Sequence, residues 1–207
     1  VNVRPAPGDG NDLHKDFDDV DRGYGHARHM GNVIAGAVLQ VYDKVSYIDA
    51  DSVRFASKMV RIPSNRPAPE EMPEAHRIND LYIAGREHEL PYEGMMLTTV
   101  VAEAARKVLL EHGPDYYEVP VTAVAVGNVA LLTMPGEAFT EIGCELKKAE
   151  GWDLVTVLGM TDESVGYFPV TQAYIEGGYE SRSSKFKQGV AEILIGEGKQ
   201  LLSQLRK

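Results

Sequence analysis

The stretch EVPVTAVAVGNVALLTMPGE, residues 118 to 137, carries the clearest structural signal in the sequence. Its β-branched and aliphatic residues form two apolar runs, 118 to 126 and 128 to 134, which predict two β-strands. The Gly-Asn pair between the runs is typical of the tight turn of a β-hairpin. A Pro-Gly pair ends the second run, so the chain is expected to turn sharply into a helix at Glu137.

Helices and strands are expected to alternate on both sides of this hairpin. Apolar residues at helical spacing predict helices, whereas alternating patterns and short apolar runs predict strands. The helices expected from this spacing cover residues 24 to 41, 74 to 88, 93 to 112, 138 to 149 and 187 to 206. Two further strands are expected at residues 53 to 62 and 153 to 159. Residues 1 to 22 are predicted to form a loop. We therefore predict an α/β fold in which layers of mixed β-sheet are flanked by α-helices, as a single domain over residues 1 to 207.

Composition narrows the range of functions. The chain has 207 residues, of which 43% are hydrophobic, so it can bury a substantial core. A net charge of -10 opposes contact with phosphates, which excludes sequence-independent binding of nucleic acid or anionic membranes. No apolar run is long enough to cross a membrane, and no signal peptide is visible, so we expect no transmembrane segment. Because the first residue is Val1 and not methionine, we expect the true start to lie elsewhere.

Three short patterns suggest sites but have simpler explanations. His26 and His29 could share a metal with the aspartates upstream, yet an isolated HxxH is more often a pair on a helix surface. The acidic segment PGDGNDLHKDFDD lacks the glycine and glutamate of a calcium-binding loop in register, so we interpret it as a solvated loop. The only cysteine, Cys144, falls in a predicted helix beside apolar residues and is expected to be a buried, inert thiol.

Two interpretations of Glu137 are open from the residues alone. A carboxylate in the first turn of a helix gains about 0.3–1 kcal/mol from the unpaired N–H groups there. Alternatively, Glu137 forms a site with residues 159 to 180, because sites collect where strands of an α/β sheet end. That segment is long for a connector, and it contains three tyrosines, namely Tyr167, Tyr174 and Tyr179.

Two motifs carry a resemblance to a known family. LLTMPGEAFTEIG and VGYFPVTQAYIEGGYE, in this order with a buried strand between them, resemble the PGE turn and the GYxxTxxxYxxxxYE loop of the neutral/alkaline non-lysosomal ceramidases. The similarity extends through RFASKMVRIPSNRPAPEE and YGHARHMGNVIAGAVL to the opening VNVRP, so it covers most of the chain. The resemblance implies that residues 1 to 207 are the C-terminal portion of a larger ceramidase-like catalytic domain.

The same resemblance implies a chemistry. These enzymes hydrolyse the amide of N-acylsphingosine, a lipid-like N-acyl amide, with a zinc ion held by two histidines, a glutamate and a tyrosine. The glutamate corresponds to Glu137 and the tyrosine to Tyr167. The two histidines belong to the N-terminal half of the parent domain, which would then be a partner of this chain, and Asn2 stands at the position of the family's serine. We expect this chain alone to bind zinc poorly and to be inactive, and the parent to be periplasmic or secreted.

Two alternatives remain beside a ceramidase-like amide hydrolase. The first is a noncatalytic binding module that kept the fold and lost the chemistry, which Asn2 and the acidic pair Asp162 and Glu163 would fit. The second is hydrolysis of another amide or ester on the same metal, because a fold does not determine the substrate.

Overall fold

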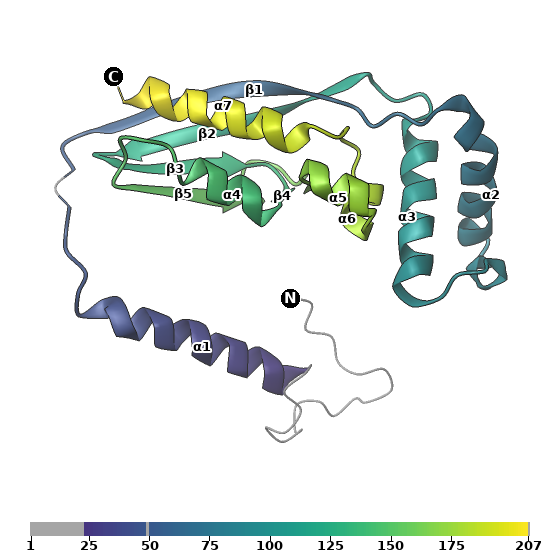
Figure 1. Ribbon diagram of the computed structural model, residues 1–207, viewed down its shortest axis with the longest axis horizontal. Helices are drawn as coiled ribbons and strands as arrows, with labels where there is room; N and C mark the ends of the chain where they lie inside the picture. Colours follow the sequence, from purple (N-terminus) through teal and green to yellow (C-terminus); the bar gives the residue numbers. More distant parts are fainter. Residues whose placement is uncertain (1–22, 49, 207) are drawn as a thin grey trace. The chain divides into compact units, whose positions relative to one another are not determined.

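The computed structural model describes residues 23–48 and 50–206, and the chain divides into two compact units, Val1–Ile48 and Asp49–Lys207. The first unit contains helix α1 (Tyr24–Tyr42), which confirms the helix predicted from residue 24 to 41 (Figure 1). Residues 1–22, predicted as a loop, lie outside the described residues. The prediction of a single domain over the whole chain stays a prediction.

The second unit is built on a four-stranded mixed sheet with the strand order β1-β2-β3-β5 (Figure 1). Strands β1, β2 and β3 are antiparallel neighbours, whereas β3 and β5 run parallel. The β2–β3 hairpin turns at Gly127, whose φ of 56° requires the left-handed conformation that glycine adopts freely. The strands are β1 (Val53–Pro63), β2 (Tyr116–Val126), β3 (Val129–Met134) and β5 (Leu154–Gly159).

One face of the sheet forms the main core of this unit. The alternation of each strand places every second side chain on this face, where helix α7 (Val190–Leu205) packs along β1, β2 and β3. Helix α4 (Thr140–Leu146) packs beside α7 and against β5. The sheet residues buried there are Val60, Ile62, Val119, Val121, Ala123, Ala125, Ala130, Leu132, Met134 and Val155.

Helix α4 is shorter than predicted, and this changes the position of Cys144. The helix begins at Thr140 and not at residue 138, and Ile142 and Leu146 are its buried residues. These two side chains are four residues apart and so share one face, which leaves Cys144 on the other side of the helix. The thiol is exposed, so the prediction of a buried cysteine is wrong.

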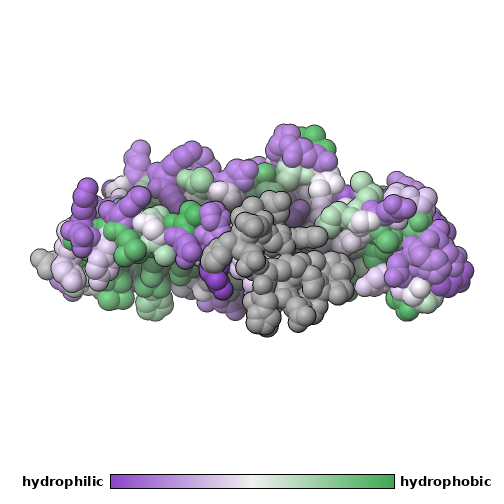
Figure 2. Space-filling model, turned by 90° about the horizontal axis from the view of Figure 1, so that it is seen from below, coloured by the Kyte–Doolittle hydropathy of each residue, from purple (hydrophilic) through white to green (hydrophobic). Residues whose placement is uncertain are grey.

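Helices α2 (Met72–Ile83) and α3 (Gly94–Leu110) pack on each other and enclose a second, smaller core. The helix expected over residues 74 to 88 ends earlier, since Gly85 turns the chain with a φ of 68°. Short 3-10 turns flank α2, namely η2 (Pro69–Glu71) and η3 (Glu87–Glu89). Hydrophilic residues gather at the right-hand end of Figure 2, where this pair lies, in keeping with its exposed ion pairs Glu74–Arg77 and Arg86–Glu89.

The segment from 159 to 180, predicted as one long loop, contains short elements. Strand β6 (Tyr167–Phe168) pairs in parallel with β4 (Glu137–Ala138), which follows the β3 turn. Two short helices complete the segment, α5 (Thr171–Glu176) and α6 (Tyr179–Ser183). Helix α6 packs against α3 and so connects this segment to the helix pair.

The predicted fold class is confirmed, because the sheet contains both antiparallel and parallel strands and helices flank it. Within residues 23–48 and 50–206, no helix is long and apolar enough to cross a membrane.

Candidate functional site

Glu137 and Tyr167, thirty residues apart in sequence, are neighbours in the structure. They are direct partners in the parallel β4–β6 pair, and the Glu137 N–H donates a hydrogen bond to the Gly166 carbonyl over 2.9 Å. Side chains of paired residues in adjacent strands lie on the same side of a sheet. The carboxylate and the phenol therefore meet at the end of β3, as the proposed site requires. Their role as metal ligands stays a prediction.

The backbone around this pair explains why the two segments meet. The carbonyls of Met134, Pro135 and Gly136 accept hydrogen bonds from the N–H groups of Thr161, Val165 and Met160, over 3.1, 2.9 and 3.2 Å. The turn after β3 is thus joined to the start of the following segment by three backbone bonds. Such bonds satisfy polar groups that would otherwise be buried without partners.

The position of Glu137 decides between the two interpretations of this residue. Helix α4 begins at Thr140, with Phe139 as its N-cap, so Glu137 lies before the first helical turn. No side chain caps this helix end. The helix-capping interpretation is therefore wrong, and Glu137 instead belongs to the small sheet that holds Tyr167.

The surroundings of Tyr167 stabilise its neutral phenol. Burial raises the pKa of this phenol above its usual range, and the nearby charge of Glu137 raises it further. A hydrogen bond with the Glu137 carboxylate acts in the same direction, because only the neutral phenol has a proton to donate. Without a cation in the site, Tyr167 is therefore expected to hold its proton at neutral pH. A bound cation would reverse the balance by favouring the phenolate.

Replacing Glu137 by glutamine should lower the pKa of Tyr167. The substitution removes the negative charge that opposes ionisation, while burial of the ring remains. The measurement is a pH titration of the ring carbon next to the hydroxyl by NMR, with labelled tyrosine and Tyr167→Phe to assign the signal. A pKa that is unchanged in Glu137→Gln would show that the two side chains do not interact.

A second tyrosine lies against the pair. The Tyr179 ring meets the Tyr167 ring edge to face, with 6.0 Å between the ring centroids. Both rings line a pocket of about 410 Å³, whose other walls include Leu109 and Val165. The third tyrosine of the segment is not at the site, since the Tyr174 hydroxyl donates to the Phe186 carbonyl over 2.7 Å. Tyr167 and Tyr179 thus border the pocket, whereas Tyr174 supports the fold.

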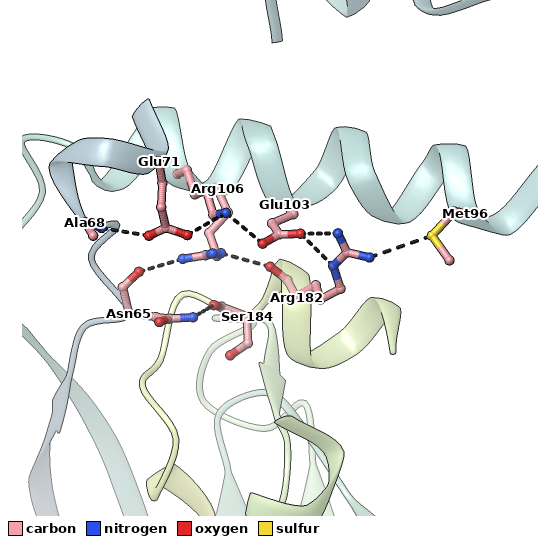
Figure 3. A network of polar contacts seen from close by, with 9 residues as sticks. Asn65, Ala68, Glu71, Met96, Glu103, Arg106, Arg182 and Ser184 are labelled. Atoms are coloured by element: carbon pink, nitrogen blue, oxygen red, sulfur yellow. Dashed lines mark hydrogen bonds and ion pairs between the residues drawn. The ribbon is translucent and has the colours of Figure 1, made fainter. Parts of the chain in front are cut away.

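The network in Figure 3 holds the pocket wall that α6 contributes. Arg106, on α3, is buried and donates to the carbonyls of Arg182 and Asn65 over 2.9 and 2.6 Å. Arg182 in turn forms an ion pair with Glu103. Burial lowers the pKa of Arg106, although the charges of Glu103 and Glu71 oppose this change. Polar contacts therefore clamp α6 to α3 beside Tyr179.

Ser184 extends this support to Tyr167 itself. Its hydroxyl donates to the Tyr167 carbonyl over 2.9 Å and accepts from the Phe186 N–H over 3.2 Å. The side chain is buried, so both bonds are shielded from water. Asn65 reaches the same region by donating to the Ser184 carbonyl over 3.3 Å.

The polar network around Arg106 and Ser184 was not predicted from the sequence. Glu103 and Arg106 fall within the helix predicted over residues 93 to 112, and charged residues of a helix are usually expected on its exposed face. A signal was present, since Thr99, Glu103, Arg106 and Leu110 follow the spacing of a buried helical stripe. A charged pair within such a stripe indicates a polar contact with another element, but it does not identify that element.

The acidic residue Asp162 has a structural explanation. Its carboxylate accepts a hydrogen bond from the Thr133 hydroxyl over 2.9 Å, which joins the segment after β5 to β3. Asp162 also has a φ of 76°, a conformation that aspartate tolerates better than most residues. This residue therefore does not by itself favour a noncatalytic module.

The remaining candidate residues belong to the first unit or lie outside the described residues. His26 and His29 lie on α1, in the other unit, and Asn2 and the acidic segment PGDGNDLHKDFDD lie outside the described residues. Over residues 23–48 and 50–206, no three or more His, Cys, Asp or Glu side chains are grouped to hold a metal. Glu137 and Tyr167 could thus provide two ligands of a metal centre, and the described residues add no such cluster to them.

Comparison with known proteins supports the fold. No protein-family model and no curated protein sequence matches the chain. The crystal structure of neutral ceramidase from Pseudomonas aeruginosa matches 99% of this chain and 35% of that chain, with a TM-score of 0.57 and 15% sequence identity. A structure described as a ceramidase complexed with C2 matches 45% of this chain and 15% of that chain, with a TM-score of 0.41 and 19% identity. The chain thus spans about a third of the length of the neutral ceramidase chain, whose fold it shares over that part.

Proposed function

We propose that this chain is the C-terminal part of the catalytic domain of a zinc-dependent amide hydrolase similar to neutral ceramidase. The observation that carries the proposal is the direct pairing of Glu137 with Tyr167 across β4 and β6. A carboxylate and a phenol are the two ligand types that the motif resemblance assigns to these positions. The proposed substrate class is a lipid-like N-acyl amide.

The donor set fits a zinc ion. Carboxylate oxygen is a common zinc ligand, and a phenol becomes a ligand when a cation stabilises its ionised form. Glu137 is exposed at the site, so its carboxylate has room for a further partner beside Tyr167. We infer that the two histidines come from the N-terminal half of the same parent domain, and that Glu137 and Tyr167 hold the ion from this half.

A zinc ion held by Glu137, Tyr167 and the two histidines would supply a water of pKa about 7 and would polarise the carbonyl of an amide. The residues of this chain would bind the rest of the substrate. The apolar wall of the pocket beside Tyr167 suits a hydrocarbon chain, and its two tyrosine rings would shield the reacting amide from bulk water. Asn2 has no nucleophilic group, so we assign no nucleophile to this chain.

The test uses the longer protein that contains this chain. We expect it to bind one zinc ion per chain, measured by elemental analysis, and to hydrolyse an N-acylsphingosine or a related N-acyl amide. Removal of the metal by a chelator should abolish turnover, and added zinc should restore it. The 207-residue chain alone should remain inactive with zinc present. Zinc-free protein that hydrolyses the amide at full rate would disprove the metal-dependent function.

A further inference from the structure

A second pocket lies between α2, α3 and α6, and the Glu137–Tyr167 site does not use it. Its volume is about 420 Å³, and it shares Ala102, Ala105 and Tyr179 with the pocket beside Tyr167. The shared residues make the two pockets neighbours along one side of α3. The second pocket therefore adjoins the candidate active site but has its own lining.

The lining combines aliphatic, aromatic and acidic groups. Leu97, Val101 and the two alanines of α3 provide an aliphatic surface, and the rings of Tyr82 and Tyr179 also line the pocket. Among the described residues that line the pocket, Glu87, from η3, is the only charged one. Pockets that bind small molecules are usually apolar with a few placed polar groups, which is the composition found here.

The side chain of Glu87 is half-buried in the lining of this pocket. Its Oε2 atom is buried and has no hydrogen-bond partner among the described residues. The adjacent Arg86 is already engaged, since its guanidinium donates to both carboxylate oxygens of Glu89 over 2.6 and 2.9 Å. A buried carboxylate oxygen without a partner is unfavourable, so a cation that enters the pocket would be drawn to this carboxylate.

We propose that this pocket binds a protonated primary amine with an aliphatic body. The ammonium group is attracted to Glu87, the rings of Tyr82 and Tyr179 add aromatic surface to the lining, and the α3 surface takes the hydrocarbon. An alkyl carboxylate would be repelled by the same charge, and an alcohol would gain only the apolar contacts. Binding needs no metal and goes beyond the proposed hydrolysis. Only its link to catalysis, namely that hydrolysis of an N-acyl amide releases an amine of this class, rests on the proposed function.

The test is calorimetric titration of the 207-residue chain with n-octylamine, n-octanol and octanoate at pH 7, with a chelator present. An alkylamine is protonated there, because its pKa lies near that of lysine, about 10.4. We expect the amine to bind about tenfold more tightly than the alcohol, as a charge-assisted contact predicts. Octanoate should bind most weakly.

Two substitutions test whether the charge of Glu87, and not the shape of the pocket, determines binding of the amine. Glu87→Gln keeps the size of the side chain and should weaken octylamine binding about tenfold while leaving octanol unchanged. Glu93→Gln removes an exposed charge beside α3, outside the pocket lining, and should change octylamine binding by less than about twofold. Circular dichroism would confirm that both variants fold.

Equal affinities for octylamine and octanol would overturn the proposal, and so would an unchanged octylamine affinity in Glu87→Gln. Failure of all three probes to bind would overturn it as well. Because the titrations contain a chelator, none of these results depends on zinc or on amide hydrolysis.

Discussion

Glu137→Gln, introduced into the longer protein, should reduce hydrolysis of an N-acyl amide at least about 100-fold and weaken zinc binding by a similar factor. The size of this effect follows because even residues that only orient a metal ligand change metal affinity or activity 10–100-fold when they are replaced. Glutamine preserves the size of the side chain but removes the negative charge at the proposed metal site. The β4–β6 pairing uses backbone groups of Glu137, so the substitution should leave the local fold intact. The measurements are kcat/KM and zinc content of the purified variant.

The matched control is Glu141→Gln. Glu141 is an exposed carboxylate in the first turn of α4, four residues after Glu137, and it does not line the pocket beside Tyr167. Its replacement should cost at most about 1 kcal/mol of stability through the helix dipole and leave hydrolysis within about twofold of the parent. If Glu137→Gln keeps its zinc and full activity, the proposed ligand role is wrong.

Gly136→Ala should lower the free energy of unfolding by about 3 kcal/mol, the upper range for overpacking a well-packed site. A Cβ atom at Gly136 would lie 2.3 Å from the Gly166 carbonyl oxygen and 2.9 Å from the Phe168 ring. The oxygen belongs to the backbone bond that holds Glu137, and the ring is completely buried, so neither can move cheaply. Displacing the Gly166 carbonyl should also break its hydrogen bond with the Glu137 N–H and so separate Glu137 from Tyr167.

The control for this prediction is Gly143→Ala in α4. A Cβ atom there would meet nothing within 4 Å, and alanine favours a helix over glycine by about 0.5–1 kcal/mol. Unfolding in urea should therefore show a loss of stability for Gly136→Ala and none for Gly143→Ala. Equal stabilities of the two variants would mean that the close approach at Gly136 is relieved by small local shifts.

Much of the fold could be predicted because the relevant signals are local. The alternation in residues 118 to 134 and the Gly-Asn turn predict β2 and β3, and helical spacing predicts α1, α3 and α7. Errors arose where tertiary contacts override local preference. Residues 137 and 138 join a strand because β6 offers hydrogen-bond partners, which shortens the predicted helix from its start.

The candidate site, like the fold, was predictable only in part from the sequence. The identities of Glu137 and Tyr167 came from motifs, and the sharp turn after β3 came from Pro135 and Gly136. Their contact depends on a parallel pairing between segments thirty residues apart, which no local pattern specifies. The raised pKa of Tyr167 follows from that contact and from burial, so it too could not be predicted from the sequence.

The sequence by itself thus determined which segments become the long strands and helices, since these follow from residue type and spacing. Its resemblance to a known family, and not residue spacing, marked Glu137 and Tyr167 as candidates for a metal site. Only the tertiary structure decided that these side chains meet and that Arg106 holds α6 beside them. It also decided that one buried oxygen of Glu87, in the lining of a second pocket, has no hydrogen-bond partner among the described residues. The physical reason is that burial, charge and hydrogen bonding in these places arise between elements far apart in the chain. Periodicity within one element shows which face is apolar, but it does not show which other element covers that face.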